Sequence, residues 1–213
     1  MVRTATTGNA ILGLLALRPS WSTWEITQQL RRNMRFFWPR AESRIYDEAR
    51  ALVDRGLATS TVTHTGRRPR TVYKITAAGR RHLREWHATP PRPTALECEP
   101  VLRILLGRLA SLDSLHASVE QVRSDAHAVL EVGRLVAAEY AAGTAPFQDD
   151  VAYRSLVFDF LSSHALAMLA WADRADAALA DLVEQSPEQA AAAGRQRVAA
   201  AAAKLPPADV THG

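Results

Sequence analysis

Apolar residues recur every three or four positions along the first 55 residues, which is the spacing of helices that bury one face. A first helix is predicted over Thr6–Leu17. Ser22 and Glu25 have the spacing of a capping box, so a second helix is predicted to start there and to run to about residue 33. A third helix is predicted over Ala41–Arg55, because Gly56 follows it where a helix end favours a positive φ.

Alternation at every second position replaces the helical spacing after this point and predicts two strands. Leu57–His64 is rich in threonine and valine, and Arg70–Ile75 alternates polar with apolar residues. The turn between them, residues 65–69, reads Thr-Gly-Arg-Arg-Pro, so the hairpin has a basic tip. Thr76 then starts a fourth helix that reaches about Trp86, and the prolines beyond it end the domain.

The second half is predicted to be helical, with a short helix from Pro100 and long helices over residues 112–142 and 149–183. The fold class is therefore mainly α with a small β-hairpin. We predict an N-terminal winged helix-turn-helix domain, a Pro-rich linker, an all-helical domain and an Ala-rich, partly disordered tail. These parts cover residues 1–88, 89–96, 97–184 and 185–213. In a winged helix the third helix enters the major groove of DNA, and the hairpin forms the wing.

The charge of the chain changes sign between its two halves. Residues 1–92 hold 17 basic and 6 acidic residues, a net charge of +11, whereas residues 93–213 hold 9 and 16, a net charge of −7. Together they give the overall charge of +4. Neutralising phosphates requires basic residues, so we expect the N-terminal half to bind double-stranded DNA and the acidic half to stay away from it.

The third predicted helix and the hairpin carry the candidate DNA contacts. Arg44 is the best candidate for a base contact, because guanidinium pairs bidentately with guanine; a solvated pair with Glu48 is the alternative. Tyr46 is either a phosphate or base partner, or packs under the wing. The hairpin cations suit phosphate contact, although a merely soluble loop has the same composition. The candidate set is Arg40, Ser43, Arg44, Tyr46, Arg67, Arg68, Arg70 and Lys74.

The aromatic residues beside the second and fourth predicted helices have two interpretations. Such rings can stack on single-stranded nucleic acid, but these lie next to helices that need a core. We expect core packing for most of Trp24, Phe36, Phe37, Trp38 and Trp86.

Four stretches of the N-terminal half resemble the PadR family of transcriptional regulators. They read Ala-Ile-Leu-Gly-Leu-Leu at residues 10–15, Ser-Arg-Ile-Tyr at 43–46, Gly-Leu at 56–57 and Gly-Arg-Arg-Pro-Arg-Thr-Val-Tyr-Lys-Ile-Thr-Ala-Ala-Gly-Arg at 66–80. The resemblance covers residues 8–86, and the helical residues 97–184 are similar to the dimerisation region of the family's virulence-activator branch. Where the family commonly has Tyr-Pro and a leucine, this chain has Tyr46, Asp47 and Ala49.

The resemblance implies a homodimeric repressor whose C-terminal all-helical domain dimerises and whose two recognition helices bind a pseudo-palindromic operator. Some members of the family release DNA when a small aromatic effector binds. The candidate effector residues in this chain are Phe147, Tyr153, Phe158 and Trp171. A helix-pairing seam is predicted along the last long helix, although an intramolecular core gives the same pattern. Its residues recur at three- or four-residue steps and are Leu156, Phe160, Ser163, Ala167 and Ala170–Trp171.

Nothing in the sequence indicates an enzyme, a metal site or a cofactor. Serine-nucleophile, phosphate-loop and dinucleotide motifs do not occur, the seven histidines are scattered, and Cys98 is the only cysteine. The apolar runs are shorter than the roughly 20 residues of a membrane span, so we expect no membrane partner and a cytoplasmic location. The alternatives are a winged-helix protein-interaction module that assembles with another regulator, and a winged-helix regulator of a different family.

Overall fold

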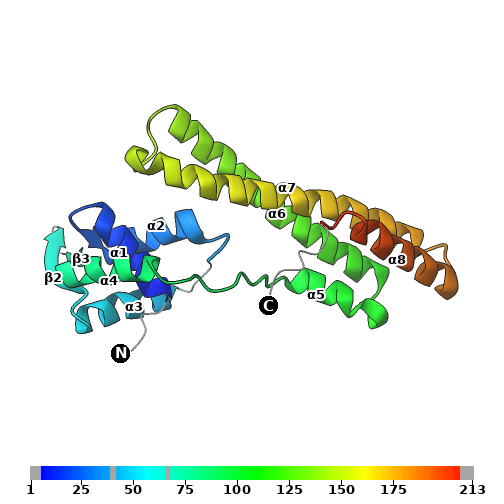
Figure 1. Ribbon diagram of the computed structural model, residues 1–213, viewed down its shortest axis with the longest axis horizontal. Helices are drawn as coiled ribbons and strands as arrows, with labels where there is room; N and C mark the ends of the chain where they lie inside the picture. The colour runs from blue at the N-terminus through cyan, green and yellow to red at the C-terminus, as the bar shows by residue number, and fades with distance from the viewer. Residues whose placement is uncertain (1–5, 39–41, 66–67, 207–213) are drawn as a thin grey trace. The chain divides into compact units, whose positions relative to one another are not determined.

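The computed structural model describes residues 6–38, 42–65 and 68–206 (Figure 1). The contacts divide the chain into two compact units, residues 1–95 and 96–213. The chain is mainly helical with one small antiparallel sheet, so the predicted fold class is confirmed. The boundaries of the linker and of the tail stay predictions.

The N-terminal unit has the winged-helix order of elements. They are α1 (Thr6–Leu17), β1 (Trp21–Ser22), α2 (Thr23–Met34), α3 (Glu42–Asp54), β2 (Ala58–Thr65), β3 (Arg68–Ile75) and α4 (Ala77–His87). α1 lies against α3, α4 and β3, and its Ile11, Leu12 and Leu15 are buried. α3 adds the buried side chains of Ile45 and Leu52 to this core. The apolar face that periodicity predicted for each of these two helices is therefore the face that packs.

The hairpin is joined by a third strand that the sequence pattern did not predict. β2 and β3 pair antiparallel, with Ala58 opposite Ile75, and the two-residue β1 pairs with the other edge of β3. Trp21 of β1 lies opposite Tyr73, and both side chains are buried. Two residues are too short a run to show alternation, so periodicity could not reveal β1.

The predicted caps form. In the capping box of α2, the Glu25 backbone N–H donates to Ser22 Oγ at 3.3 Å, and the Ser22 N–H donates to Glu25 Oε2 at 2.8 Å. Thr76 caps α4, with its Oγ1 accepting from the Gly79 N–H at 3.0 Å. Gly56 has a φ of 68°, the left-handed conformation predicted for the residue after the third helix.

Four elements of the N-terminal unit meet at the backbone of Leu57. The Leu57 N–H donates to the Leu52 carbonyl of α3 at 2.9 Å, and the Leu57 carbonyl accepts from the Thr76 N–H at 3.1 Å. Thr76 Oγ1 also lies 2.8 Å from the Gly56 carbonyl oxygen. Gly79 packs so closely here that a Cβ added to it would lie 2.1 Å from the Leu57 oxygen. The end of α3, the start of β2, the end of β3 and the first turn of α4 are therefore joined at one point.

The aromatic residues that we expected in the core are less buried than predicted. Trp24 is 66% exposed, Phe37 43% and Trp86 36%, so the expectation is wrong for these three. The fully buried ring is Trp21. α2 turns Ile26 into the core, and a position two residues away on a helix points to the opposite side, which leaves Trp24 in solvent.

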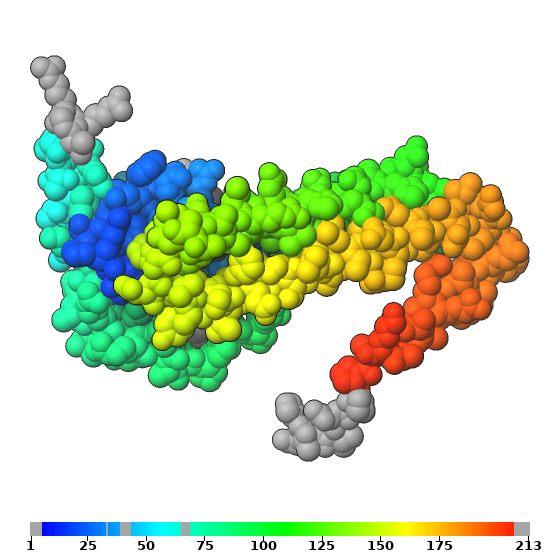
Figure 2. Space-filling model, turned by 90° about the horizontal axis from the view of Figure 1, so that it is seen from above, coloured from blue at the N-terminus to red at the C-terminus, as the bar shows by residue number. Residues whose placement is uncertain are grey.

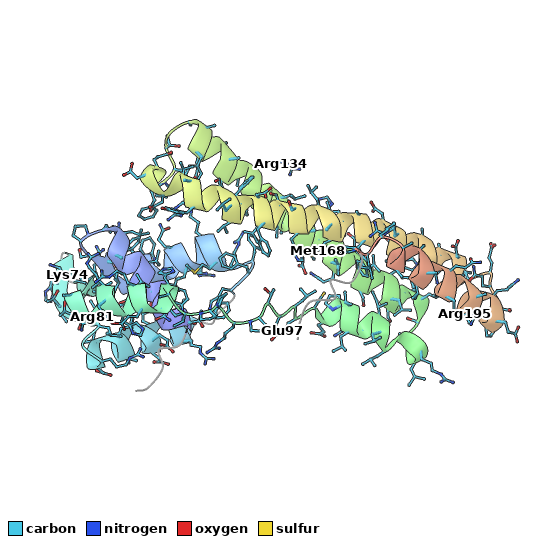
Figure 3. The ribbon with its side chains drawn as sticks, viewed as in Figure 1. Lys74, Arg81, Glu97, Arg134, Met168 and Arg195 are labelled. Atoms are coloured by element: carbon cyan, nitrogen blue, oxygen red, sulfur yellow. The ribbon has the colours of Figure 1, made fainter. Side chains whose placement is uncertain are left out.

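The C-terminal unit is built of helices, as predicted. Its elements are α5 (Glu99–Leu105), the 3₁₀ turn η1 (Gly107–Leu109), α6 (Leu112–Ala141), the 3₁₀ turn η2 (Gln148–Asp150), α7 (Val151–Asp181) and α8 (Pro187–Ala202). α6 and α7 lie side by side (Figure 2), with exposed side chains such as Arg134 around them (Figure 3). Their core packs Leu115 and Val119 of α6 against Ala172 and Leu179 of α7. α8 falls within the segment expected to be an Ala-rich tail.

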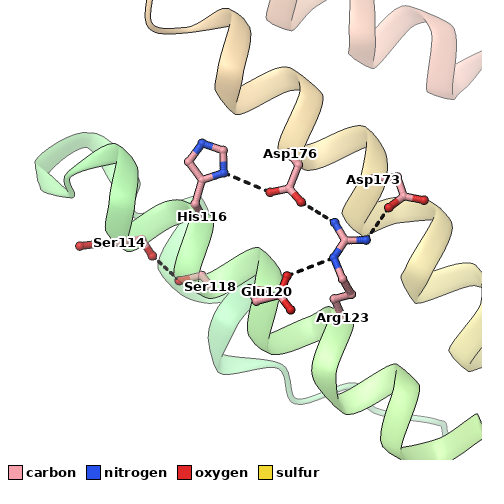
Figure 4. Close-up of polar contacts among 7 residues, drawn as sticks. All are labelled: Ser114, His116, Ser118, Glu120, Arg123, Asp173 and Asp176. Carbon is pink, nitrogen blue, oxygen red and sulfur yellow. Dashed lines mark hydrogen bonds and ion pairs between the residues drawn. The ribbon is translucent and has the colours of Figure 1, made fainter.

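A cluster of charged side chains joins α6 to α7 beside this core (Figure 4). Arg123 pairs with Asp173 and Asp176 of α7, and its Nε lies 3.1 Å from Glu120 Oε2. His116 Nδ1 lies 3.1 Å from Asp176 Oδ1. Hydrogen bonds to Asp173 and Asp176 raise the pKa of Arg123. Burial alone would raise the pKa of Asp176, but hydrogen bonds from His116 and Arg123 outweigh it and lower that pKa.

α7 is long and apolar enough to cross a membrane by length and composition, over Gln148–Asp181. The sequence expectation considered only uninterrupted apolar runs, and these are shorter than this helix. The finding is weak evidence for a membrane span, because a helix of a soluble protein passes the same test. α7 pairs with α6 through a few buried side chains and through the Arg123 cluster.

Candidate nucleic-acid interface

α3 buries one face and presents the other to solvent. Ile45 and Leu52 are at most 2% exposed, and the helix contacts α1 and α2. Arg44, Asp47 and Arg50 recur at three-residue steps, and all three are exposed. The outward face predicted for the third helix is therefore the face left open to a ligand.

Arg44 and Tyr46 are both exposed on α3. No ion pair joins Arg44 to another side chain in the part of the chain that the structure describes. Glu48 was the alternative partner of Arg44, but its Oε2 lies 3.9 Å from Arg55 Nη2. Tyr46 is 39% exposed, whereas a ring packed under the wing would be buried. Both observations favour contact with an external partner over the structural alternatives.

Four of the eight predicted contact residues lie wholly or partly outside the described residues. Arg40 and Arg67 fall in the two gaps, at residues 39–41 and 66–67. The backbone of Ser43 belongs to the first turn of α3, and that of Arg68 begins β3 opposite Thr65; neither side chain is described. The backbone therefore places Ser43 at the start of the third helix and Arg68 near the hairpin tip.

The wing is exposed to solvent. Every residue of β2 from Thr59 to His64 is exposed, and Val62 reaches 64%. Lys74 is exposed on β3, opposite Thr59 (Figure 3). A solvated hairpin that carries a lysine along one strand and arginines at its tip suits contact with phosphates.

Arg70 differs from the other predicted contacts because it is ion-paired. Its guanidinium donates to Glu25 Oε2, the carboxylate oxygen of the α2 capping box. Arg18 Nη2 lies 2.8 Å from the other carboxylate oxygen of Glu25, Oε1. The central carbon of the Arg18 guanidinium lies 3.5 Å from the centre of the Trp21 ring. Burial alone would raise the pKa of Glu25, but hydrogen bonds from Ser22 and Arg70 and the charge of Arg18 lower it to about 2.

Glu25 is expected to make the N-terminal unit less stable in acid. Its pKa is lowered from 4.5 to about 2, so its stabilisation is present above pH 4.5 and is lost as the pH falls towards 2. Urea denaturation followed by tryptophan fluorescence at about pH 7 and about pH 3 measures this loss. Glu25→Gln should show a smaller difference between the two pH values than the natural chain, and an unchanged difference would mean that other groups titrate.

The end of α2 is basic and was not among the contacts predicted from the sequence. Arg31 and Arg32 lie in its last turn and Arg35 follows directly; all three are exposed. The guanidinium of Arg35 lies 4.5 Å from the centre of the Phe36 ring. Cations at a helix C-terminus also stabilise the helix dipole, so they have a structural use beside any DNA contact. The signal was the cluster of arginines just before the link to α3.

The four candidate effector residues are not brought together within one chain. Phe147, with a left-handed φ of 62°, lies before α7, and the Arg154 guanidinium is 4.7 Å from its ring centre. Tyr153 is 75% exposed, and the Phe158 ring lies against α6. Trp171 packs against the core of α6 and α7. The 18 residues from Tyr153 to Trp171 span about 27 Å of α7, more than one small aromatic molecule covers.

Two cavities stand out among the described residues, and neither is lined by these aromatic side chains. One of about 240 Å³ lies between α1, α2 and α3, with Met34 and Trp38 in its wall. The other, of about 380 Å³, lies among polar residues such as Glu184 and Gln185, between α7 and α8. Within the described ranges no group of three or more His, Cys, Asp or Glu is placed to hold a metal ion.

Comparison with known proteins links the N-terminal unit to one family. Residues 11–85 match the sequence model of the family described as Transcriptional regulator PadR-like family. No curated protein matches the sequence.

Solved structures share the fold over most of the chain. *Bacillus subtilis* PadR in complex with operator DNA matches with a TM-score of 0.66 and 22% identity, over 82% of this chain and 99% of that chain. The same protein in complex with p-coumaric acid matches with a TM-score of 0.60 and 21% identity, over 82% of this chain and 99% of that chain. The Vibrio cholerae virulence activator AphA matches with a TM-score of 0.61 and 21% identity, over 83% of this chain and 99% of that chain.

Proposed function

We propose that the chain binds double-stranded DNA sequence-specifically, as a homodimer that represses transcription, because residues 11–85 match the PadR-like transcriptional regulator family. The observation that carries the proposal is the open face of α3, where Arg44 is exposed. The operator complex of *Bacillus subtilis* PadR, a protein with the same fold, supports it.

α3 is the proposed recognition helix. Arg44 reads a guanine in the major groove through its O6 and N7, and Tyr46 contacts a neighbouring base or phosphate. Phosphate contacts come from the start of α3 and from the wing, and they fix the register of the protein on the duplex. The residues proposed for these contacts are Arg40, Ser43, Arg67, Arg68 and Lys74.

Exposed apolar side chains in the C-terminal unit support a homodimer. Leu156 and Phe160 lie one turn apart on α7 and are 69% and 58% exposed, so they are not part of an intramolecular core. In and after α5, Leu105, Leu106 and Leu109 are between 69% and 97% exposed. Apolar surface of this extent marks a partner surface. A second copy is the proposed partner, because a dimer sets two recognition helices about one DNA turn, roughly 34 Å, apart.

A small planar aromatic effector is proposed to release the DNA. The complex of *Bacillus subtilis* PadR with p-coumaric acid supports this ligand class for a protein of this fold. The proposed contacts are drawn from Phe147, Tyr153, Phe158 and Trp171. Since Tyr153 and Trp171 lie far apart on α7, one molecule contacts only part of this set in one protomer. The readout is a shift in both thermal stability and DNA affinity on addition of planar aromatic acids.

The chain is proposed to have no catalytic activity and to act in the cytoplasm, where its DNA lies. The second candidate function is a winged-helix module that assembles with another regulator. Its support is that exposed apolar side chains such as Trp24 suit a protein partner as well as a second copy. The two candidates differ in duplex binding, because only the DNA-binding protein releases counterions from phosphates and so binds more weakly as salt rises.

The test is fluorescence anisotropy on DNA from upstream of the protein's own gene and on unrelated DNA, at two salt concentrations. We expect tighter binding to the upstream DNA, weakened by salt. Arg44→Ala is expected to weaken binding to the preferred site by about tenfold or more and binding to unrelated DNA much less, because base contacts carry the specificity.

Arg134→Ala is the matched control, since Arg134 is an exposed arginine on α6 (Figure 3). It removes the same charge from the C-terminal unit and should leave both affinities unchanged. If the folded protein does not bind duplex DNA at low salt, the protein-interaction module takes first place.

A further inference from the structure

A charge cluster attaches the wing to the start of α2. Glu25 Oε2 accepts the Ser22 N–H at 2.8 Å, the Ser22 hydroxyl at 2.6 Å and the Arg70 guanidinium, and Glu25 Oε1 lies 2.8 Å from Arg18. The carboxylate side chain is only 25% exposed. Both of its oxygens are therefore occupied, and Arg70 is the only one of its partners that comes from the wing.

Arg70 also lies where the pairing of the third strand stops. β1 contributes two residues, with Trp21 opposite Tyr73 and Ser22 opposite Val72. Arg70 lies in β3 two positions before Val72, beyond the last of these pairs. On the other edge of β3, Thr63 Oγ1 donates to the Arg70 carbonyl at 3.2 Å. One residue thus connects β3 to α2 through its side chain and to β2 through its backbone.

We propose that Arg70 is a positioning residue that fixes the direction of the wing through Glu25, and is not itself a phosphate contact. This inference rests on the proposed DNA binding by α3 and the wing. Arg70 donates through Nη2 to a carboxylate that three other groups hold in place, so Glu25 fixes the direction of the guanidinium although the Arg70 side chain is 43% exposed. Lys74, four residues along the same strand, is exposed like Arg70 but has no ion pair within the described residues, so it remains a proposed phosphate contact.

Because Glu25 is negatively charged, removing its charge distinguishes a positioning role of Glu25 and Arg70 from a purely electrostatic effect on DNA binding. If electrostatics alone governed DNA binding, removing an acidic residue from the DNA-binding unit would strengthen binding to the duplex. If Glu25 holds Arg70 and so the wing, Glu25→Gln weakens binding although the protein becomes more basic. The two interpretations therefore predict opposite signs for one substitution.

The experiment measures duplex affinity over a range of salt concentrations for the full chain and its variants Arg70→Gln, Glu25→Gln and Lys74→Gln. We expect Lys74→Gln to reduce the slope of log affinity against log salt by about one, the loss of one phosphate contact. Arg70→Gln and Glu25→Gln should each weaken binding by about fivefold with the slope unchanged. The double variant should bind no more weakly than either single one, because both changes break the same link.

Amide hydrogen exchange without DNA tests the cluster independently. Arg70→Gln and Glu25→Gln should speed exchange to a similar extent in β2 and β3, and Lys74→Gln should not. The proposal is overturned if Arg70→Gln reduces the salt slope as Lys74→Gln does, if Glu25→Gln tightens binding, or if exchange in the wing is unchanged. If the natural chain binds no duplex, the proposed function fails, while the exchange rates still decide whether Arg70 and Glu25 hold the wing.

Discussion

Gly79→Ala is expected to destabilise the N-terminal unit by about 3 kcal/mol, because the added methyl group has no room. Its Cβ would lie 2.1 Å from the Leu57 carbonyl oxygen and 2.9 Å from the Ile75 side chain. The carbonyl already accepts a hydrogen bond from Thr76, so it cannot move away without opening the junction of α3, β2, β3 and α4. Urea denaturation of the full chain, followed by tryptophan fluorescence, measures the loss, since four of the five tryptophans lie in this unit.

Gly13→Ala is the matched control for this prediction. Gly13 lies inside α1, and a Cβ added there would meet no atom within 4 Å. Alanine is more favourable than glycine within a helix by roughly 0.5–1 kcal/mol, so this variant should be at least as stable as the natural chain. Equal stability of the two variants would contradict the close approach at Leu57.

The double variant Leu156→Glu, Phe160→Glu is expected to be monomeric and to bind its preferred DNA at least about 100-fold more weakly. Both side chains are exposed in the single chain, so glutamate is tolerated there. In a dimer formed through this stripe of α7, each copy would bury two unpaired carboxylates, which is strongly unfavourable. Sedimentation analysis distinguishes the 23.4 kDa chain from its dimer.

Val198→Glu on α8 is the control for the dimer prediction. Val198 is 71% exposed and also apolar, but it lies outside the proposed seam. This variant should remain a dimer with unchanged DNA affinity, and circular dichroism should show unchanged helix content in both proteins. A double variant that stays dimeric would contradict pairing through α7 and would move the proposed interface to the leucines of α5 and η1.

Elements that local chemistry specifies were predictable from the sequence. The first helix has the predicted bounds, Thr6–Leu17, and the caps at Ser22 and Thr76 form as expected, because each cap uses residues within one turn of its helix. β1 was not predictable, because Trp21 pairs with Tyr73, far away in the chain, and contributes too few residues to show a period. Residues 11–85 match the PadR-like family model, which favours this family over another family of winged-helix regulators.

The partners of charged side chains could not be predicted. Arg70 and Lys74 belong to the same basic run and are both exposed, yet Arg70 pairs with Glu25, 45 positions earlier, whereas Lys74 has no ion pair among the described residues. Arg123 likewise pairs with Asp173 and Asp176, 50 and 53 positions later. Periodicity assigns a residue to a face of its own helix or strand. Only the tertiary fold decides which other element supplies the opposite charge, so a basic cluster in a sequence overstates the number of cations left for phosphates.

The junction at Leu57 has a mechanical consequence for regulation. Its hydrogen bonds join α3, the wing and α4 at one point, and α4 is the last helix before the chain continues to the C-terminal unit. A movement of α4 is therefore expected to carry α3, the proposed recognition helix, with it. In the proposed homodimer, we expect a ligand bound in the C-terminal half to change the separation of the two α3 helices and not the side chains that each helix presents. We then expect the effect of such a ligand on DNA affinity to depend on the distance between the two half-sites of the operator. It should not depend on the sequence within either half-site.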